Sequence, residues 1–267
     1  MAHTVGTTHW LMTAMFGLVL TGCAGIHTAP TPEARQALAP SGKLRVALLH
    51  GRPLSVTQDS ASGEMKGVGF DLGKEFARRI GVPFEPVLYP SIRPLLDSVN
   101  SGQWDVAFLV VSVAQAKDVD FTAPHLEIEF GYLIPGGSSI STLAEVDRSG
   151  IRVAVPEKGG ADIFLSRTLK NAVLVRGSDA GALEMLKSGK ADVFAGNKPT
   201  LFELLNGLPG FRVLDGRFAT DPVAMAIPKG RDPGMAYARK FVEDAKSEGL
   251  VKAAIERAEI RGALVAQ

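Results

Sequence analysis

Short, fully apolar runs alternate along the chain with segments whose apolar residues recur at helical spacing. The clearest run is Val106–Val111, which is apolar at every position and follows a glycine-containing turn at Ser101–Asp105. A strand without a polar face is buried on both sides, as in mainly parallel sheets covered by helices. In such open sheets, ligands bind beyond the carboxyl ends of the strands. The segment from Ser112 to Pro124 is therefore the first candidate for a site.

The same pattern continues through the rest of the sequence. The predicted strands are residues 44–49, 84–89, 105–111, 126–134, 152–155, 174–176, 193–195, 211–214 and 223–228. The predicted helices are residues 71–80, 92–99, 162–169, 179–187, 199–206, 234–247 and 250–261. Because strands and helices alternate, the pattern predicts an α/β fold.

Two motifs occur twice, in the same order. Arg45-Val46-Ala47 precedes Ser101-Gly102-Gln103-Trp104-Asp105-Val106, and Arg152-Val153-Ala154 precedes Ser188-Gly189-Lys190-Ala191-Asp192-Val193. This order favours two similar lobes, although Gly-x-x-Asp-Val is also an ordinary join between helix and strand. We predict lobe 1 at 42–126 and 224–267 and lobe 2 at 127–223, with a hinge and a cleft between them.

Composition narrows the function classes. The chain has 267 residues, 46% of them apolar, and a net charge of +1. This balance is typical of a globular protein and gives no sign of a nucleic-acid surface. A single cysteine excludes an internal disulfide. The sequence shows no metal-spaced cluster, so we expect no cofactor, no metal, no nucleic-acid partner and a monomer.

The N-terminal region has the features of an export signal. Leu11–Leu20 is apolar but too short to span a bilayer, and Leu20-Thr21-Gly22-Cys23 follows it. This looks like a bacterial lipoprotein signal at 1–23, with lipid on Cys23 and a flexible tether at 24–41. The region before the apolar run lacks Lys and Arg, so an ordinary secretory leader stays open as the alternative. The lipoprotein interpretation predicts a periplasmic protein that is lipid-anchored to the membrane.

Five sequence blocks resemble one protein family. The blocks are Gly42–Val46, Gly67–Val82, Ser101–Val106, Val119–His125 and Lys187–Val193. Together they resemble family 3 extracellular solute-binding proteins, which have the periplasmic-binding-protein type II fold. The resemblance implies a two-lobed α/β protein that delivers a solute to the permease of an ABC importer.

The resemblance also implies ligand positions in lobe 1. Family members that bind amino acids usually carry an Arg after the second motif's strand, where it clamps the ligand carboxylate. Here that position is Gln115 or Lys117, depending on where a gap is placed. Lysine meets an anion only as a point charge, and glutamine offers neutral hydrogen bonds. The hydroxyl usually found a few residues earlier corresponds to Ser112.

In lobe 2 the usual acid for a ligand ammonium aligns with Asn197, and the usual hydroxyl aligns with Gly160 or Ala161. Each exchange costs roughly 1–3 kcal/mol in a desolvated cleft, so we expect the solute not to be a standard α-amino acid. Basic side chains, including Lys198, favour an anionic solute. The full candidate set is His50, Arg52, Ser112, Gln115, Lys117, His125, Gly160, Ala161 and Asn197.

We therefore predict the solute-binding component of an ABC transporter, which captures a small polar solute and is not an enzyme. Two alternatives stay open. One is a ligand-sensing lipoprotein, and the other is a cyclohexadienyl-dehydratase-like enzyme with His125 or Glu127 as general acid. Several of these residues also have structural interpretations: Asp105 and Asp192 would cap turns, and Glu127 and Glu129 would face solvent or brace the hinge.

Overall fold

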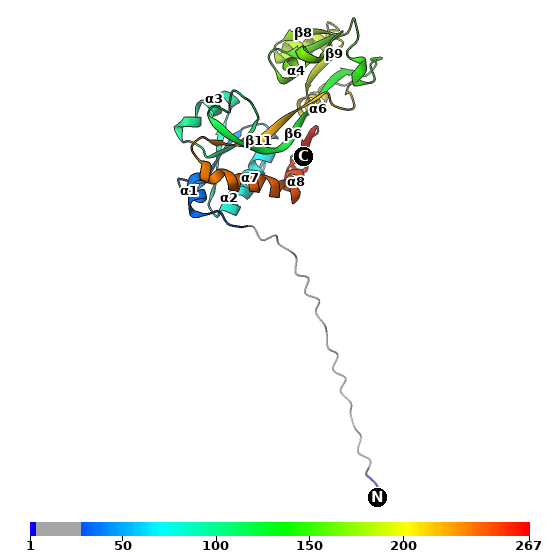
Figure 1. Cartoon of the computed structure of the whole chain (residues 1–267). Coiled ribbons are helices and arrows are strands. Elements are labelled where there is room, and N and C mark those ends of the chain that lie inside the picture. The colour runs from blue at the N-terminus through cyan, green and yellow to red at the C-terminus, as the bar shows by residue number, and fades with distance from the viewer. Residues whose placement is uncertain (4–27) are drawn as a thin grey trace.

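The computed structural model describes residues 1–3 and 28–267. The predicted signal peptide and the lipid site at Cys23 fall almost entirely outside these residues, so the structure says nothing of them. Figure 1 shows two bodies of helices and strands joined by a narrow connection. The predicted α/β, two-lobed architecture is confirmed. Within the described residues, no helix combines the length and apolar character needed to cross a bilayer.

Lobe 1 is built from both ends of the chain. Its strands are β1 (Leu44–Leu49), β2 (Thr57–Gln58), β3 (Met65–Lys66), β4 (Phe84–Tyr89), β5 (Val106–Val110) and β12 (Ala263–Val265). Its helices are α1 (Pro32–Leu38), α2 (Val68–Ile80), α3 (Ile92–Asp97), the 3-10 turn η1 (Val99–Ser101), α7 (Asp232–Ser247) and α8 (Leu250–Arg257).

Lobe 2 comes from the middle of the chain. Its strands are β7 (Arg152–Pro156), β8 (Val173–Gly177), β9 (Val193–Asn197) and β10 (Phe211–Val213). Its helices are the 3-10 turn η2 (Leu143–Glu145), α4 (Gly160–Thr168), α5 (Asp179–Lys187) and α6 (Lys198–Leu205). Two long strands, β6 (Val119–Pro135) and β11 (Ala219–Pro228), run through both lobes.

The sheet order shows that the two lobes repeat one arrangement. The order is β4-β1-β5-β11-β6-β9-β7-β8. In lobe 1, β1 lies between β4 and β5 and is parallel to both. In lobe 2, β7 lies between β8 and β9 and is parallel to both. The doubled motifs of the sequence therefore occupy equivalent strands, as expected from a repeat.

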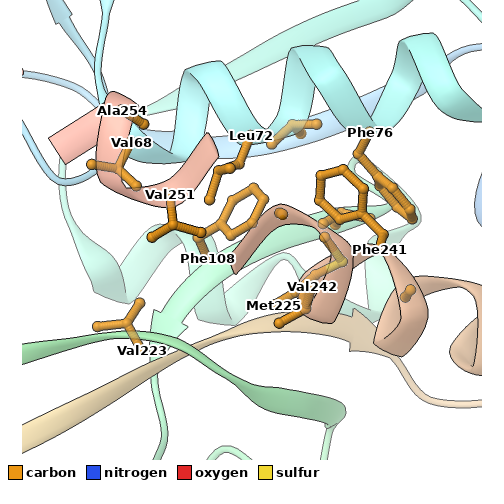
Figure 2. Packing of buried hydrophobic residues seen from close by; sticks show 14 of the residues in the cluster. Val68, Leu72, Phe76, Phe108, Val223, Met225, Phe241, Val242, Val251 and Ala254 are labelled. Atoms are coloured by element: carbon orange, nitrogen blue, oxygen red, sulfur yellow. The ribbon is translucent and has the colours of Figure 1, made fainter. Parts of the chain in front are cut away.

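The core of lobe 1 lies between the sheet and three helices. Figure 2 shows apolar side chains of α2, α7 and α8 meeting over the sheet, with Phe108 of β5 among them. A second buried cluster lies on the other face of the sheet, where Trp104 and Leu95 are fully buried. Burial of apolar side chains on both faces explains why Val106–Leu109 carries no polar alternation, whereas Val110 and Val111 at the end of the run are 38% exposed, contrary to the prediction.

The predicted tether at 24–41 is wrong for its C-terminal part. Pro32–Leu38 forms α1, whose first turn is capped because Thr31 Oγ1 accepts a hydrogen bond from the Ala34 backbone N–H at 3.2 Å. Ala34 and Leu38 lie four residues apart on one helix face and are buried, and α1 packs against α7. The Ala- and Pro-rich composition suggested a flexible segment, whereas the proline stands at the start of a helix, where its missing N–H has no cost.

Three strands meet at the connection between the lobes. β6 and β11 pair antiparallel along most of their length. β12, which the sequence did not predict, pairs with Leu126–Ile128 of β6. The C-terminal segment therefore ends beside the hinge, near α6 of lobe 2 (Figure 1).

Candidate functional site

The loop after β1 forms the lobe 1 wall of the site. The backbone N–H groups at the start of α2 donate hydrogen bonds to the carbonyls of Pro53, Leu54 and Ser55, at 3.0–3.2 Å. Ser55 Oγ also accepts a 2.7 Å hydrogen bond from the Leu49 backbone N–H. A Cβ on Gly67 would lie 2.5 Å from the Ser55 carbonyl oxygen, so only glycine permits this close approach. The loop is therefore held rigidly against α2.

A cleft of about 530 Å³ separates this loop from lobe 2. Its lobe 1 side is Gly51–Leu54, its lobe 2 side is Asn197 with one face of α6, and Ile128 of β6 lies at the hinge. The segment Ala258–Arg261 closes one end. The structure thus brings two of the predicted ligand residues, Arg52 and Asn197, to one cleft.

Asn197 has a fixed orientation at the end of β9. Its Oδ1 accepts a 3.0 Å hydrogen bond from the Thr200 backbone N–H and caps α6. The side chain is half-buried. Since the oxygen is used by the helix, the amide nitrogen is the part of Asn197 that remains for a ligand.

The hinge strands form a row of side chains beside the cleft. Asn197 of β9, Phe130 of β6 and Ala219 of β11 are direct neighbours across the sheet. Asp221 lies two residues further along β11, opposite Ile128. Residues opposite one another in an antiparallel pair point to the same face, so Asp221, Phe130 and Asn197 share the face of the cleft.

At Gly160, the start of α4 in lobe 2 packs against this row of side chains. Gly160 is the first residue of α4, and a Cβ there would lie 2.7 Å from Phe130 Cζ and 3.1 Å from Asp221 Oδ2. Glycine is therefore required for α4 to approach the hinge strands so closely. Ala161 is buried in the lobe 2 core, which leaves only the backbone of this turn for a ligand.

The loop after β5 holds three more predicted residues, none of which lines the 530 Å³ cleft. Ser112 begins a turn in which its carbonyl accepts hydrogen bonds from the backbone N–H groups of Gln115 and Ala116, both at 3.1 Å. Gln115 Oε1 is buried and has no hydrogen-bond partner within the described residues. The Lys117 side chain is 77% exposed and points into solvent near Asp118. His50 is exposed at the end of β1 and likewise lies outside the cleft.

His125 lies in the lobe 1 core, which corrects its prediction as a ligand residue. The residue is 1% exposed, and its ring meets the Phe108 ring edge-on with centroids 5.3 Å apart. Burial, with a smaller contribution from nearby Lys246, lowers the pKa of His125 to about 3. The strand register gives the reason: Pro124 and Leu126 pair with consecutive residues of β11, so His125 is the extra residue of a β-bulge.

Lys198 is also unavailable to a solute. Its Nζ donates a 3.0 Å charge-assisted hydrogen bond to Glu129 Oε2, and both side chains are buried. Arg217 donates to the other oxygen of Glu129, also at 3.0 Å. The expected bias of the cleft towards an anion therefore fails for Lys198. Glu129 is therefore buried and braces the hinge, which is one of the two structural roles expected for it, the other being a side chain that faces solvent.

The charges that do line the cleft are balanced. Arg52 and Arg261 face Glu203 and Glu259, and the Arg261 guanidinium lies 3.7 Å from the centre of the Phe202 ring. Three parts of this region were not predicted from the sequence: the α6 face, the 258–261 segment and Asp221. Of these, Asp221 alone had a visible signal, as an acid two residues before the apolar run Val223–Pro228.

Comparison with known proteins identifies related sequences and folds. The model of the family described as bacterial extracellular solute-binding proteins, family 3, matches residues 44–257. The ABC transporter glutamine-binding protein GlnH of Bacillus subtilis (strain 168) is 23% identical over 199 residues, which are 72% of this chain and 72% of that protein. The glutamine-binding protein of Geobacillus stearothermophilus is 22% identical over 217 residues, 78% of this chain and 81% of that protein.

Solved structures share the same fold. An ancestral cationic amino acid solute-binding protein superposes with a TM-score of 0.64 at 21% identity, covering 84% of this chain and 98% of its own. A putative binding component of an ABC transporter from Wolinella succinogenes, complexed with lysine, gives a TM-score of 0.63 at 24% identity, covering 81% and 95%. An ancestral cyclohexadienyl dehydratase gives 0.56 at 21% identity, covering 85% and 96%.

Proposed function

The chain belongs to family 3 of the bacterial extracellular solute-binding proteins, and we propose that it captures an amino acid for an ABC importer. The observation that carries this proposal is the cleft between two lobes, with Arg52 on one wall and Asn197 on the other, joined by hinge strands. Closure of two lobes around a solute is how such an arrangement binds. A permease in the membrane is the partner that the proposal implies.

We propose an amino acid as the solute, in place of the non-amino-acid anion expected from the sequence, for two reasons. Two of the basic groups behind that expectation, His125 and Lys198, are buried away from the cleft. In addition, the names of the related proteins refer to glutamine, lysine and cationic amino acids. The missing carboxylate-clamping Arg remains a departure from the family pattern, and the proposal requires other groups to take its place.

The enzyme alternative has less support. Its two predicted acids were His125, which is buried in the lobe 1 core, and Glu127. Glu127 alternates with Ile128 along β6 and therefore points to the face opposite the cleft. A binding protein is consistent with the positions of both residues.

A thermal-shift and calorimetric screen tests the proposal. The unliganded protein would be titrated with the standard amino acids, small carboxylates and sugars. We expect at least one amino acid to raise Tm, since a ligand at 100 times its Kd adds about 2.7 kcal/mol of stability. Stabilisation by carboxylates or sugars alone, with no response to any amino acid, would contradict the proposal.

We also propose export with lipid attachment at Cys23. The motif Leu20-Thr21-Gly22-Cys23 supports it, and the family is extracellular. Expression with an alkyne-labelled fatty acid should label the wild-type chain and not a Cys23→Ser variant. No labelling of either chain would favour the ordinary secretory leader, and equal labelling of both would mean that the fatty acid is not attached at Cys23.

A further inference from the structure

The charge that family members place at the end of β9 is absent here. The resemblance puts the ammonium-binding acid at Asn197, which is neutral and whose oxygen already caps α6. An amino acid bound in a desolvated cleft still needs a counter-charge for its ammonium group, because an unpaired buried charge is costly. The question is which carboxylate near the cleft could supply it.

Asp221 meets the geometric requirements. It stands on the same sheet face as Asn197, with only β6 between their strands, so the two positions are about 12 Å apart, at two strand spacings across and two residues along. Its carboxylate is half-buried and has no hydrogen bond or ion pair with any residue that the structure describes. Asp221 and Gly160 lie beside the 530 Å³ cleft and are not among its lining residues, whereas Ile128, the neighbour of Asp221 across the ladder, is one of them. Desolvation raises the pKa of Asp221, as expected for an acid without a counter-charge.

The position of α4 indicates which ligand group Asp221 would meet. Asp221 Oδ2 lies 3.1 Å from the point where a Cβ of Gly160 would stand, directly at the first turn of α4. Free backbone N–H groups at a helix start favour a carboxylate. In an α-amino acid the carboxylate and the ammonium group are bonded to one carbon. A ligand carboxylate at the start of α4 would therefore bring its ammonium group beside Asp221.

We propose that Asp221 receives the α-ammonium group of the bound amino acid and thus replaces the acid that family members carry at the position of Asn197. This inference rests on the proposed amino-acid function. It makes Asp221 a specificity-determining residue that selects ligands with an α-amino group.

Calorimetric titration of an Asp221→Asn variant tests the inference. The probes are L-glutamine, L-arginine and L-lysine, each paired with the analogue in which hydrogen replaces the α-amino group. We expect Asp221→Asn to lose about tenfold or more in affinity for the amino acid and little for its analogue, since only the amino acid offers a charge-assisted hydrogen bond. The control Asp215→Asn removes the same charge at an exposed position of lobe 2 and should bind as wild type does.

A second variant separates recognition from folding. The double variant Asn197→Asp/Asp221→Asn moves the acid to the usual family position, where aspartate also caps α6 well. It should regain affinity for the amino acid relative to Asp221→Asn alone.

Three results would count against the inference. Unchanged amino-acid affinity in Asp221→Asn overturns it and leaves the proposed function standing. Equal losses for the amino acid and its analogue, without rescue by the double variant, assign Asp221 a structural role and overturn it as well. Wild-type protein that binds no amino acid overturns the proposed function and this inference together.

Discussion

The two lobes contain the same arginine–aspartate joint in different surroundings. In lobe 1, Arg45 donates to Asp105 from its backbone N–H at 3.0 Å and from its guanidinium at 2.9 and 2.7 Å. In lobe 2, Arg152 makes the corresponding bonds to Asp192 at 2.8, 3.0 and 2.8 Å. Each guanidinium also donates to the carbonyl of the glycine in the preceding turn. The doubled motif therefore encodes one joint, between β1 and the start of β5 in lobe 1 and between β7 and the start of β9 in lobe 2.

The environment of the joint differs between the lobes. Asp105 is completely buried and also accepts a 2.7 Å hydrogen bond from Arg231, which precedes α7. The Asp192 and Arg152 side chains are 34% and 42% exposed, and no third charge joins them in the structure. The chain returns to lobe 1 through β11 and α7, and this return covers the joint there. The local motif determines the geometry of the pair, whereas the elements packed over it determine how far the pair is buried.

The largest effect on the free energy of unfolding is expected from removal of the buried acid Asp105. Asp105→Ala leaves the guanidinium groups of Arg45 and Arg231 without their shared counter-charge, which should lower the free energy of unfolding by about 3–5 kcal/mol. Asp192→Ala should lower it clearly less, because water reaches Arg152. Urea unfolding of both variants measures the difference. Equal losses would show that burial does not distinguish the two joints.

Acid should weaken lobe 1 before lobe 2. The folded pKa of His125 is about 3, below its ordinary 6.5, so the unfolded chain binds a proton that the folded chain does not. Stability is therefore fully present above about pH 6.5 and falls as the pH drops towards 3. At pH 5 the loss from this group is about 2 kcal/mol. Residues 127–223 contain no histidine, so lobe 2 has no loss of this kind between pH 6.5 and pH 5.

A His125→Leu variant should lose less stability than wild type between pH 7 and pH 5. Chemical unfolding at the two pH values measures this, and His50→Gln, at an exposed histidine, is the matched control. If His125→Leu shows the same acid dependence as wild type, the burial of His125 is not the cause.

The next largest effect on the free energy of unfolding is expected from the hinge pair Lys198–Glu129. Lys198→Met keeps an apolar stem against Gly131 and Gly262 but leaves Glu129 with Arg217 alone. We expect a loss of about 1–2 kcal/mol, since one oxygen of a buried carboxylate loses its partner. Lys229→Met, which breaks the half-exposed pair with Asp120, should have little effect in the same urea titration. If Lys198→Met is as stable as wild type, Glu129 does not depend on its lysine partner from lobe 2.

The smallest expected effect concerns the contact of the C-terminal segment with α6. Arg261→Ala removes a cation–π contact with Phe202 and should cost about 0.5–1 kcal/mol. Arg261→Lys keeps the charge but not the planar group, and should fall between wild type and Arg261→Ala. Alanine and lysine variants as stable as wild type would show that this contact does not tie the lobes.

Much of the fold was predictable because it rests on long, regular patterns. The apolar runs marked the strands, and the doubled motifs marked the equivalent strands of two lobes. β12 was missed because a three-residue strand carries no period, and α1 was missed because its composition is rich in alanine and proline. Both depend on long-range contacts, with β6 and α7 respectively, that the local sequence does not reveal.

The site was predictable only where strand ends determine it. Arg52 and Asn197 follow β1 and end β9, and both line the cleft. His125 was misplaced because a bulge shifts the register of β6, which no local pattern signals. Asp221 was missed because its position depends on how β11 pairs with β6 and on the approach of Gly160, two contacts between distant parts of the chain.

The pairing of β12 with β6 suggests a use for the protein as an optical sensor. Leu264 of β12 is partly exposed and lies opposite Glu127. Glu127 belongs to β6, which links the lobes. An environment-sensitive dye on a cysteine introduced in place of Leu264, in a Cys23→Ser background, would sit beside the strand that links the two lobes. Its emission would follow solute capture from outside the cleft, without competing with the solute for space.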